Sequence, residues 1–383
     1  MAGKTYDVAV IGAGVFGSWT ARELQGAGRS VILVDAYGAA HNRSSSGGES
    51  RIIRMGYGKD EIYTLWSNRS LGIWKEFFRR VGEDLFHPTG VLEVAAGEDA
   101  YVTECEVVLE RARVRTEKLS RSDLAKRFPQ FNLEGIGWGL FEPDSGVLMA
   151  RRALQALVRE TVKDGADFLP AAVLAPSGQG RLESVATGKG ERVEAGVFVF
   201  ACGPWLPKVF PDLLGGRITP TRQQVFFFGA APGDTRFQPP AFPTWIFLAD
   251  EVYGMPDLEN RGMKISFHFL GPAIDPDTAD RVVSPESLQA MRDYVGRRFP
   301  ALKGAPIVGT RVCQYENTSS GDFLIDRHPA FENVWLVGGG SGHGFKHGPV
   351  LGEYVAQRIL EGDGVDARFS LATKTSVQGG RVF

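Results

Sequence analysis

The chain has 383 residues, and its 43 lysines and arginines against 45 aspartates and glutamates leave a formal net charge of −2. This length allows two or three domains with cores of their own, and the near balance of charge argues against nucleic acid as the main partner. No apolar run reaches the ~18 residues that a membrane span needs. The 48 glycines predict many tight turns and close approaches of the backbone.

The first 35 residues predict a strand, a glycine turn, a helix and a second strand. An apolar run at 6–11 precedes the turn Gly12-Ala13-Gly14-Val15-Phe16-Gly17, and a helical pattern then continues to residue 24. A second apolar run at 30–35 ends in Asp35. Residues 36–58 are polar and rich in Gly and Ser, which predicts a loop. Residues 60–81 have apolar side chains at helical spacing.

The rest of the chain predicts alternating strands and helices. We expect strands at 85–96, 136–142, 197–201 and 334–337, helices at 151–164, 285–299 and 346–361, and strands with turns over 220–275. The fold class is therefore α/β with two domains. A discontinuous Rossmann-like nucleotide domain would comprise 1–85, 145–219 and 320–383, with a mixed or antiparallel sheet domain at 86–144 and 220–319 inserted into it.

The opening glycine motif predicts a dinucleotide site. Gly12 would make the turn, Gly14 would let the backbone approach a pyrophosphate, and Gly17 would allow close packing of helix on strand. Asp35 would accept hydrogen bonds from a ribose, and an acid at this position favours FAD or NAD over NADP. A second glycine turn at 338–344, followed by Lys346 at a helix start, suits the anionic edge of a reduced flavin, which favours FAD.

Five further segments resemble a known family. They are Ser50-Arg51-Ile52-Ile53-Arg54, Ala201-Cys202-Gly203-Pro204-Trp205, Met263-Lys264-Ile265-Ser266-Phe267-His268, Cys313-Gln314-Tyr315-Glu316-Asn317-Thr318 and Gly342-His343-Gly344-Phe345-Lys346. With the opening motif, in this order and at this spacing, they resemble the monomeric sarcosine oxidase and N-methyltryptophan oxidase family of D-amino-acid-oxidase-like flavoproteins. The resemblance spans nearly the whole chain and implies an FAD-binding domain and a substrate-binding domain.

The resemblance implies FAD held by a thioether from Cys313. From the residues alone, Cys313 is simply a cysteine late in a strand, and such residues are usually buried and inert. The motifs and the resemblance together predict these cofactor-binding residues: Gly12, Gly14, Val15, Phe16, Gly17, Asp35, Ala36, Ser50, Arg51, Cys202, Gly203, Trp205, Cys313, Gly342, His343, Gly344, Phe345 and Lys346. Cys202, at a strand end, also suits simple packing, and we assign no role to Cys105.

The resemblance also implies the substrate site. Arg54 and Lys346 match the family's pair that holds the substrate carboxylate, which suits two fixed cations. Tyr315 matches a residue of the pocket wall. The alternative for Arg54 is a surface ion pair.

Three residues are the predicted catalytic groups: Lys264, His268 and Arg51. Lys264 matches the lysine that promotes oxygen reduction, although a strand lysine can equally face solvent. His268 lies four residues on, which predicts the same strand face, and it matches an active-site histidine. Arg51 matches a residue near the flavin. Gly47 stands where the family often has a histidine four positions before this arginine, which leaves that histidine's contribution open.

We expect an FAD-dependent oxidase of the C–N bond of a small secondary amino acid, sarcosine or another N-methyl amino acid. It would form an imine that hydrolyses, while O2 is reduced to hydrogen peroxide. The alternatives are a pipecolate, proline or glycated amino acid oxidase, a flavin amine dehydrogenase with another electron acceptor, and a non-catalytic nucleotide-binding protein. We expect no metal site, because His343 and His347 have no third ligand at suitable spacing.

The three cysteines, Cys105, Cys202 and Cys313, are too few and too far apart for a disulfide framework. They predict a reducing compartment. No targeting tripeptide is present at 380–383, so we expect the cytoplasm. The family resemblance favours a monomer.

Overall fold

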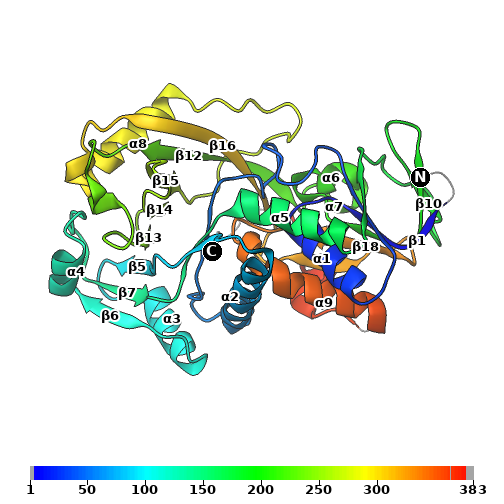
Figure 1. Ribbon diagram of the computed structural model, residues 1–383, viewed down its shortest axis with the longest axis horizontal. Coiled ribbons are helices and arrows are strands. Elements are labelled where there is room, and N and C mark those ends of the chain that lie inside the picture. Colours follow the sequence, from blue (N-terminus) through cyan, green and yellow to red (C-terminus); the bar gives the residue numbers. More distant parts are fainter. Residues whose placement is uncertain (1–3, 363, 377–383) are drawn as a thin grey trace.

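The structure, a computed structural model, describes residues 4–362 and 364–376, so the C-terminal residues 380–383 lie outside the described part. Three β-sheets form its framework. Figure 1 shows one sheet with α1 and α9 at one end of the molecule, and a second sheet with α4 and α8 at the other.

The first sheet is seven-stranded and mostly parallel. Its order is β17 (Leu324–Arg327), β18 (Val334–Gly338), β11 (Arg192–Phe200), β1 (Thr5–Ile11), β2 (Val31–Asp35) and β9 (Asp167–Pro170), with β10 (Ser184–Ala186) paired to β11. The five strands from β18 to β9 are parallel, and β17 and β10 are antiparallel edges. The glycine turns after β1, β11 and β18 therefore meet at one edge of the sheet, where such folds bind nucleotides.

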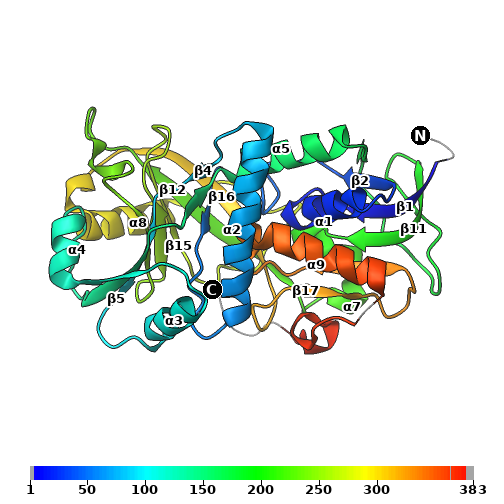
Figure 2. The same ribbon diagram turned by 60° about the horizontal axis from the view of Figure 1, so that its bottom comes forward.

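Alternate strand residues bury against different layers. Val8 and Val10 face a core built by α1 (Val15–Gly26), α5 (Ala150–Lys163) and α9 (Gly348–Glu361). Ala9 and Ile11 face a second core built partly by α6 (Leu206–Val209) and α7 (Pro211–Leu214). A strand buried on both faces reads as a continuous apolar run, which is why the sequence predicts these strands well. Figure 2 shows α1 and α9 side by side over this sheet.

The second sheet is eight-stranded and mixed. Its order is β16 (Ile307–Asn317), β12 (Thr219–Phe228), β15 (Met263–Phe267), β14 (Val252–Met255), β13 (Thr244–Phe247), β5 (Val91–Ala95), β7 (Trp138–Glu142) and β6 (Glu117–Ser120). An aromatic-rich core on one face includes residues of α4 (Arg121–Arg127) and α8 (Pro285–Arg298). Its other face is available to a binding site.

A small third sheet joins the two larger ones, with the order β3 (Arg51–Ile53), β8 (Gly146–Leu148) and β4 (Phe86–His87). The helix α2 (Glu61–Val81) stands between the two halves in Figure 2, and α3 (Ala100–Arg111) lies beside it. Among the described residues, no helix combines the length and the apolar character that a membrane crossing requires.

The predicted α/β class with a second mixed sheet is confirmed. Four local predictions are wrong. The loop at 36–58 contains strand β3, because Arg51–Ile53 pairs with distant β8. The strand at 85–96 is two strands, β4 and β5. The last helix begins at Gly348 and not at residue 346, because a 3-10 turn, Gly344–His347, precedes it. Contrary to the prediction, His268 does not lie on a strand, because β15 ends at Phe267. The proposed domain boundaries stay a prediction.

Candidate functional site

A cavity of about 300 Å³ runs along the C-terminal edge of the parallel sheet. Most of the predicted cofactor residues lie on its wall: Gly12, Gly14, Val15, Phe16, Asp35, Ala36, Arg51, Cys202, Gly203, Trp205, Gly342, Gly344 and Phe345. Gly17 and Ser50 are not among the described residues that line it. Cys313, His343 and Lys346 line a second cavity instead.

Two glycines of the opening motif are required by backbone packing. Gly12 has φ +112°, and a Cβ there would overlap the carbonyl oxygen of Ala201. A Cβ at Gly17 would overlap the carbonyl oxygen of Gly12. Helix α1 can therefore start directly against the turn, with its N-terminus at the cavity, where it favours an anion.

Replacing Gly17 with Ala is expected to lower the free energy of unfolding by about 3 kcal/mol, the upper range for overpacking, because neither backbone segment can yield. Gly26 at the end of α1 is the matched control, since a Cβ there meets nothing within 4 Å. Chemical denaturation of Gly17→Ala and Gly26→Ala measures the difference. Equal stability of the two variants would contradict the packing role of Gly17.

Asp35 organises the same edge. One carboxylate oxygen accepts from the N–H of Ala13 at 2.7 Å, and the other accepts from the N–H groups of Tyr37 and Gly38 at 2.9 and 2.8 Å. A carboxylate accepts about four hydrogen bonds, so one position remains for a ribose hydroxyl. The glycine-lined wall, the helix N-terminus and this acid fit a dinucleotide such as FAD.

A second cavity of about 350 Å³ adjoins the first and shares Arg51, Tyr315, Gly342 and Phe345 with it. One of its walls is the free face of the eight-stranded sheet. Val312, Met263 and Ile265 point into the aromatic core. Their strand neighbours Cys313, Lys264 and Tyr315 consequently project from the opposite face, because side chains alternate along a strand.

Arg51 lines both cavities, and Cys313 lies beside it on the wall of the second. Cys313 is buried, and Arg51 Nη2 donates to its Sγ at 3.6 Å. The same guanidinium donates to the carbonyl oxygens of Ser50 and Ser45 at 2.8 and 2.6 Å. Arg51 thus ties the cysteine to the 45–50 loop.

Lys264 is buried behind Ser50. Its Nζ donates to the Ser50 carbonyl oxygen at 2.8 Å and to Ser50 Oγ at 3.2 Å. Burial, and then repulsion from Arg51, lowers the pKa of Lys264 to about 7. Lys264 therefore points inward, not into solvent, although it is not among the described residues on the wall of either cavity.

Arg54 lies in the wall of the second cavity, with 3% of its surface exposed. Its Nη1 is 2.9 Å from Glu93 Oε1, and its Nη2 donates to Tyr101 Oη at 3.5 Å. Burial opposes the charge, but Tyr101 and Glu93 raise the pKa of Arg54 above its ordinary value. The ion pair is therefore buried, not on the surface. A second buried acid, Glu142, accepts from the N–H groups of Met55 and Gly56 at 2.8 Å.

Lys346 faces the same cavity from the 3-10 turn before α9. Its Nζ donates to Tyr57 Oη, and Trp74 Nε1 of α2 donates to the Lys346 carbonyl oxygen at 3.1 Å. Tyr57 Oη also contacts His347 Nε2 at 2.9 Å. Burial, and then repulsion from Arg54, lowers the pKa of Lys346 well below its usual value. A carboxylate between Arg54 and Lys346 would favour the charged lysine again.

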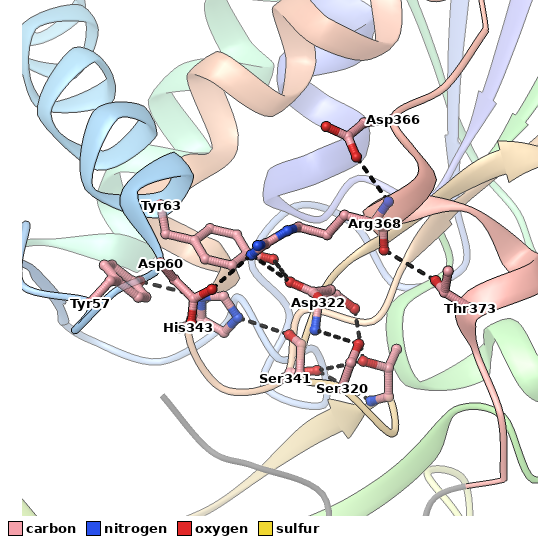
Figure 3. Close-up of polar contacts among 12 residues, drawn as sticks. Tyr57, Asp60, Tyr63, Ser320, Asp322, Ser341, His343, Asp366, Arg368 and Thr373 are labelled. Carbon is pink, nitrogen blue, oxygen red and sulfur yellow. Dashed lines mark hydrogen bonds and ion pairs between the residues drawn. The ribbon is translucent and has the colours of Figure 1, made fainter. Parts of the chain in front are cut away.

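A polar network includes His343, the residue that precedes this turn (Figure 3). Arg368 reaches Asp60 and Asp322 at 3.0 and 3.3 Å, and Tyr63 Oη donates to Asp322 at 2.7 Å. His343 is held by contacts with Tyr57 Oη at 3.3 Å and with the Gly321 carbonyl oxygen at 3.0 Å. The network connects the start of α2, the loop after β16 and the C-terminal segment to the Lys346 turn.

His268 lines the second cavity just beyond the end of β15. Its backbone N–H donates to the Glu251 carbonyl oxygen at 2.6 Å, so one backbone hydrogen bond continues beyond the end of the strand. Its Nδ1 is 3.4 Å from Tyr315 Oη, and its ring meets Tyr253 edge-on at 5.4 Å. His268 and Tyr315 therefore lie together on the wall of the second cavity.

The structure explains why a glycine stands at position 47. A Cβ there would overlap the carbonyl oxygen of His41, so a histidine does not fit this backbone. His41 itself lines the first cavity. Within the described ranges, no cluster of three His, Cys, Asp or Glu side chains could hold a metal ion.

These features define a class of protein: a dinucleotide-binding enzyme whose cofactor cavity opens into a second cavity. A sequence model of the FAD dependent oxidoreductase family matches residues 7–358, and the chain belongs to this family. FAD is accordingly its cofactor.

Curated relatives agree. The chain is 32% identical over 367 residues to the monomeric sarcosine oxidase of Streptomyces avermitilis, covering 94% of each. It is 30% identical to the N-methyl-L-tryptophan oxidase of Salmonella arizonae, covering 93% of this chain and 95% of the relative. The resemblance predicted from the motifs is confirmed. The solved L-proline dehydrogenase from P. horikoshii has a similar fold, with a TM-score of 0.82 at 21% identity over 96% of this chain and 97% of that one.

Several residues of the site are absent from the sequence prediction. Glu93 pairs with Arg54, the charge of Arg54 acts on the buried Glu142, Tyr57 contacts Lys346, and Glu316 lines the cofactor cavity. The charge of Glu93 within the apolar run Val91–Ala95 is the signal that could have found it, because a charge inside a buried strand needs a partner. Cys105, to which we assigned no role, accepts from the Gly58 N–H at 2.9 Å.

Proposed function

We propose that this protein is an FAD-dependent oxidase of the C–N bond of a small secondary amino acid, sarcosine or another N-methyl amino acid. The observation that carries the proposal is the pair of buried basic side chains, Arg54 and Lys346, on the wall of a cavity that adjoins the cofactor cavity. Two fixed donors can hold a carboxylate in one orientation. The relatives named for sarcosine and N-methyltryptophan support this substrate class.

Each predicted group then has a place in the reaction. FAD, when bound, supplies the electron acceptor that no side chain provides. Arg54 and Lys346 orient the substrate carboxylate, while Tyr315 and His268 form the wall beside the amine. Arg51 holds the loop next to Cys313. Lys264 presents a positive charge where O2 is reduced to hydrogen peroxide. The carbon next to nitrogen loses two electrons and a proton, and the resulting imine takes up water.

We include covalent attachment of FAD through Cys313 in the proposal, because the thiol lies on the wall of the second cavity beside Arg51, which lines both cavities. Acid precipitation of the wild-type protein is expected to leave the flavin in the pellet. The Cys313→Ser variant should release it to the supernatant, and Cys105→Ser is the matched control that should retain it. Free flavin from the wild-type protein would contradict the attachment.

Anaerobic mixing of the holoenzyme with candidate amines tests the function. Sarcosine and larger N-methyl amino acids should bleach the oxidised flavin absorption, and air should restore it quickly. Proline, pipecolate, a glycated amino acid and the matching primary amino acids complete the panel. If no secondary amino acid bleaches the flavin, the proposed substrate class is wrong. Bleaching that air does not reverse, but an artificial electron acceptor does, would identify a dehydrogenase.

A second candidate is a substrate bulkier than sarcosine. The second cavity, of about 350 Å³, falls in the range of ~300–1,000 Å³ that holds drug-sized ligands. Its lining includes the apolar side chains Ile52, Val225, Ile246, Leu248, Val252 and Met255. Larger N-methyl or glycated amino acids would then bleach the flavin at lower concentration than sarcosine does.

We also propose that the protein acts as a monomer in the cytoplasm. All three cysteines are free, which suits a reducing compartment. The relative's description as a monomeric enzyme supports the oligomeric state.

A further inference from the structure

One acidic side chain lies in the wall of the cofactor cavity without a counter-ion. Glu316 sits near the end of β16, is 7% exposed and lines the first cavity. Its Oε1 accepts a hydrogen bond from the Gly340 N–H at 3.2 Å. Its Oε2 is buried and has no hydrogen-bond partner among the described residues. A buried polar oxygen of this kind is costly unless something absent from the free protein satisfies it.

Two glycine turns enclose this carboxyl group. A Cβ at Gly203 would lie 3.1 Å from Oε2, and a Cβ at Gly340 would lie 3.1 Å from Oε1. These turns follow β11 and β18, so Glu316 lies at the sheet edge where the chain binds its dinucleotide. No ion pair joins Glu316 to a cation within the described chain, and burial raises the pKa of its carboxyl to about 7.

We propose that Glu316 is a binding residue for FAD and that it holds the cofactor as a neutral carboxylic acid, donating a hydrogen bond from its unpartnered oxygen to an oxygen of FAD. A pyrophosphate offers only acceptors and carries negative charge, so an ionised Glu316 beside it would repel the cofactor. The protonated acid adds a donor instead. FAD binding consequently takes up one proton whenever the free protein carries an ionised Glu316.

Other titratable groups also face this cavity. They are Asp35, Tyr37 and His41 at and after β2, Arg51 on β3, Cys202 after β11, Asp277 in the loop before α8, and Tyr315 on β16 itself. Burial, and then Asp35 and Glu316, raises the pKa of Cys202, which therefore remains a thiol at neutral pH. Asp35 is held by three backbone N–H groups. His41 is the neighbour that a test must separate from Glu316.

The pH dependence of reversible FAD binding tests the proposal directly. The full-length protein with Cys313→Ala, prepared free of flavin, is titrated with FAD, and quenching of flavin fluorescence gives Kd from pH 6 to pH 9. Kd should be constant below about pH 7 and should rise by up to about tenfold per pH unit above it, the limit for one linked proton. Adding Glu316→Gln should make Kd independent of pH, because an amide keeps the donor at every pH. Adding His41→Gln should leave the slope intact.

The proposal is overturned if Kd of the Cys313→Ala protein is independent of pH or falls as pH rises. It is also overturned if the slope persists in the Glu316→Gln variant. Should Cys313→Ala fail to bind FAD, infrared spectra of the holoenzyme provide the test. A carboxylic acid carbonyl band at pH 7.5 should be present in the wild type and missing in Glu316→Gln. A wild type without this band would contradict the neutral acid.

Discussion

Replacing Lys264 with Met is expected to slow reoxidation of the reduced enzyme by O2 about 10²- to 10³-fold, the loss typical when one charge-stabilising donor is removed from an active site. Forming superoxide is the unfavourable first step, and a buried cation lowers its cost because water does not screen the charge. Reduction by substrate should change little, since Lys264 lies behind Ser50 and is not among the described residues on the wall of the second cavity. Stopped-flow measurement of the two half-reactions separates the effects.

The pH dependence of the same step provides a second measure. The pKa of Lys264 is lowered to about 7, so the cation is present below this pH and is lost as the pH rises through it. The rate of reoxidation should therefore fall above about pH 7 in the wild type. Lys264→Arg keeps its charge throughout this range and should give a flat profile. A wild-type rate that increases with pH would assign the oxygen site elsewhere.

The parts of the fold that were predicted from sequence depend on short-range patterns. A strand buried on both faces is apolar throughout, and Gly17 is fixed by its contact with Gly12 within the same turn. Gly12 was predicted from the local motif, although the structure fixes it by the approach of the distant Ala201 carbonyl oxygen. Strand β3 was missed because its three residues become a strand only by pairing with β8, almost a hundred residues later in the chain. Such pairing leaves no periodicity in so short a segment.

The candidate site could also be predicted only in part, because its geometry depends on long-range contacts. The motifs named Arg54 and Lys346, but residue types alone do not reveal that both are buried on one cavity wall. The ion pair of Arg54 with Glu93 joins the residue after β3 to a strand of another sheet, so no local sequence pattern predicts it. Likewise, Gly47 is intelligible only from the approach of the His41 carbonyl oxygen. These features depend on packing between residues far apart in the chain, which local patterns in a single sequence do not reveal.

Replacing Arg54 is expected to have the largest effect on substrate binding, with Kd for a carboxylate ligand rising about 10²-fold or more, as for a buried charge pair that loses one partner. The Arg54→Met variant has a second effect, because it leaves Glu93 buried opposite no cation. Breaking such a pair costs about 3–5 kcal/mol of stability. A loss of activity in Arg54→Met alone would thus mix two causes.

The double variant Arg54→Met, Glu93→Gln separates these causes. Glutamine removes the orphaned charge, so the double variant should regain most of the stability that Arg54→Met loses, while its affinity for carboxylates stays low. Arg54→Lys keeps the charge but not the planar fork, and we expect about a tenfold weakening. Acetate titrated against the flavin spectrum measures Kd, and thermal unfolding measures stability. If the double variant binds acetate as the wild type does, Arg54 does not hold the substrate carboxylate. In that case Lys346 and the Tyr57 hydroxyl would be the groups to replace next.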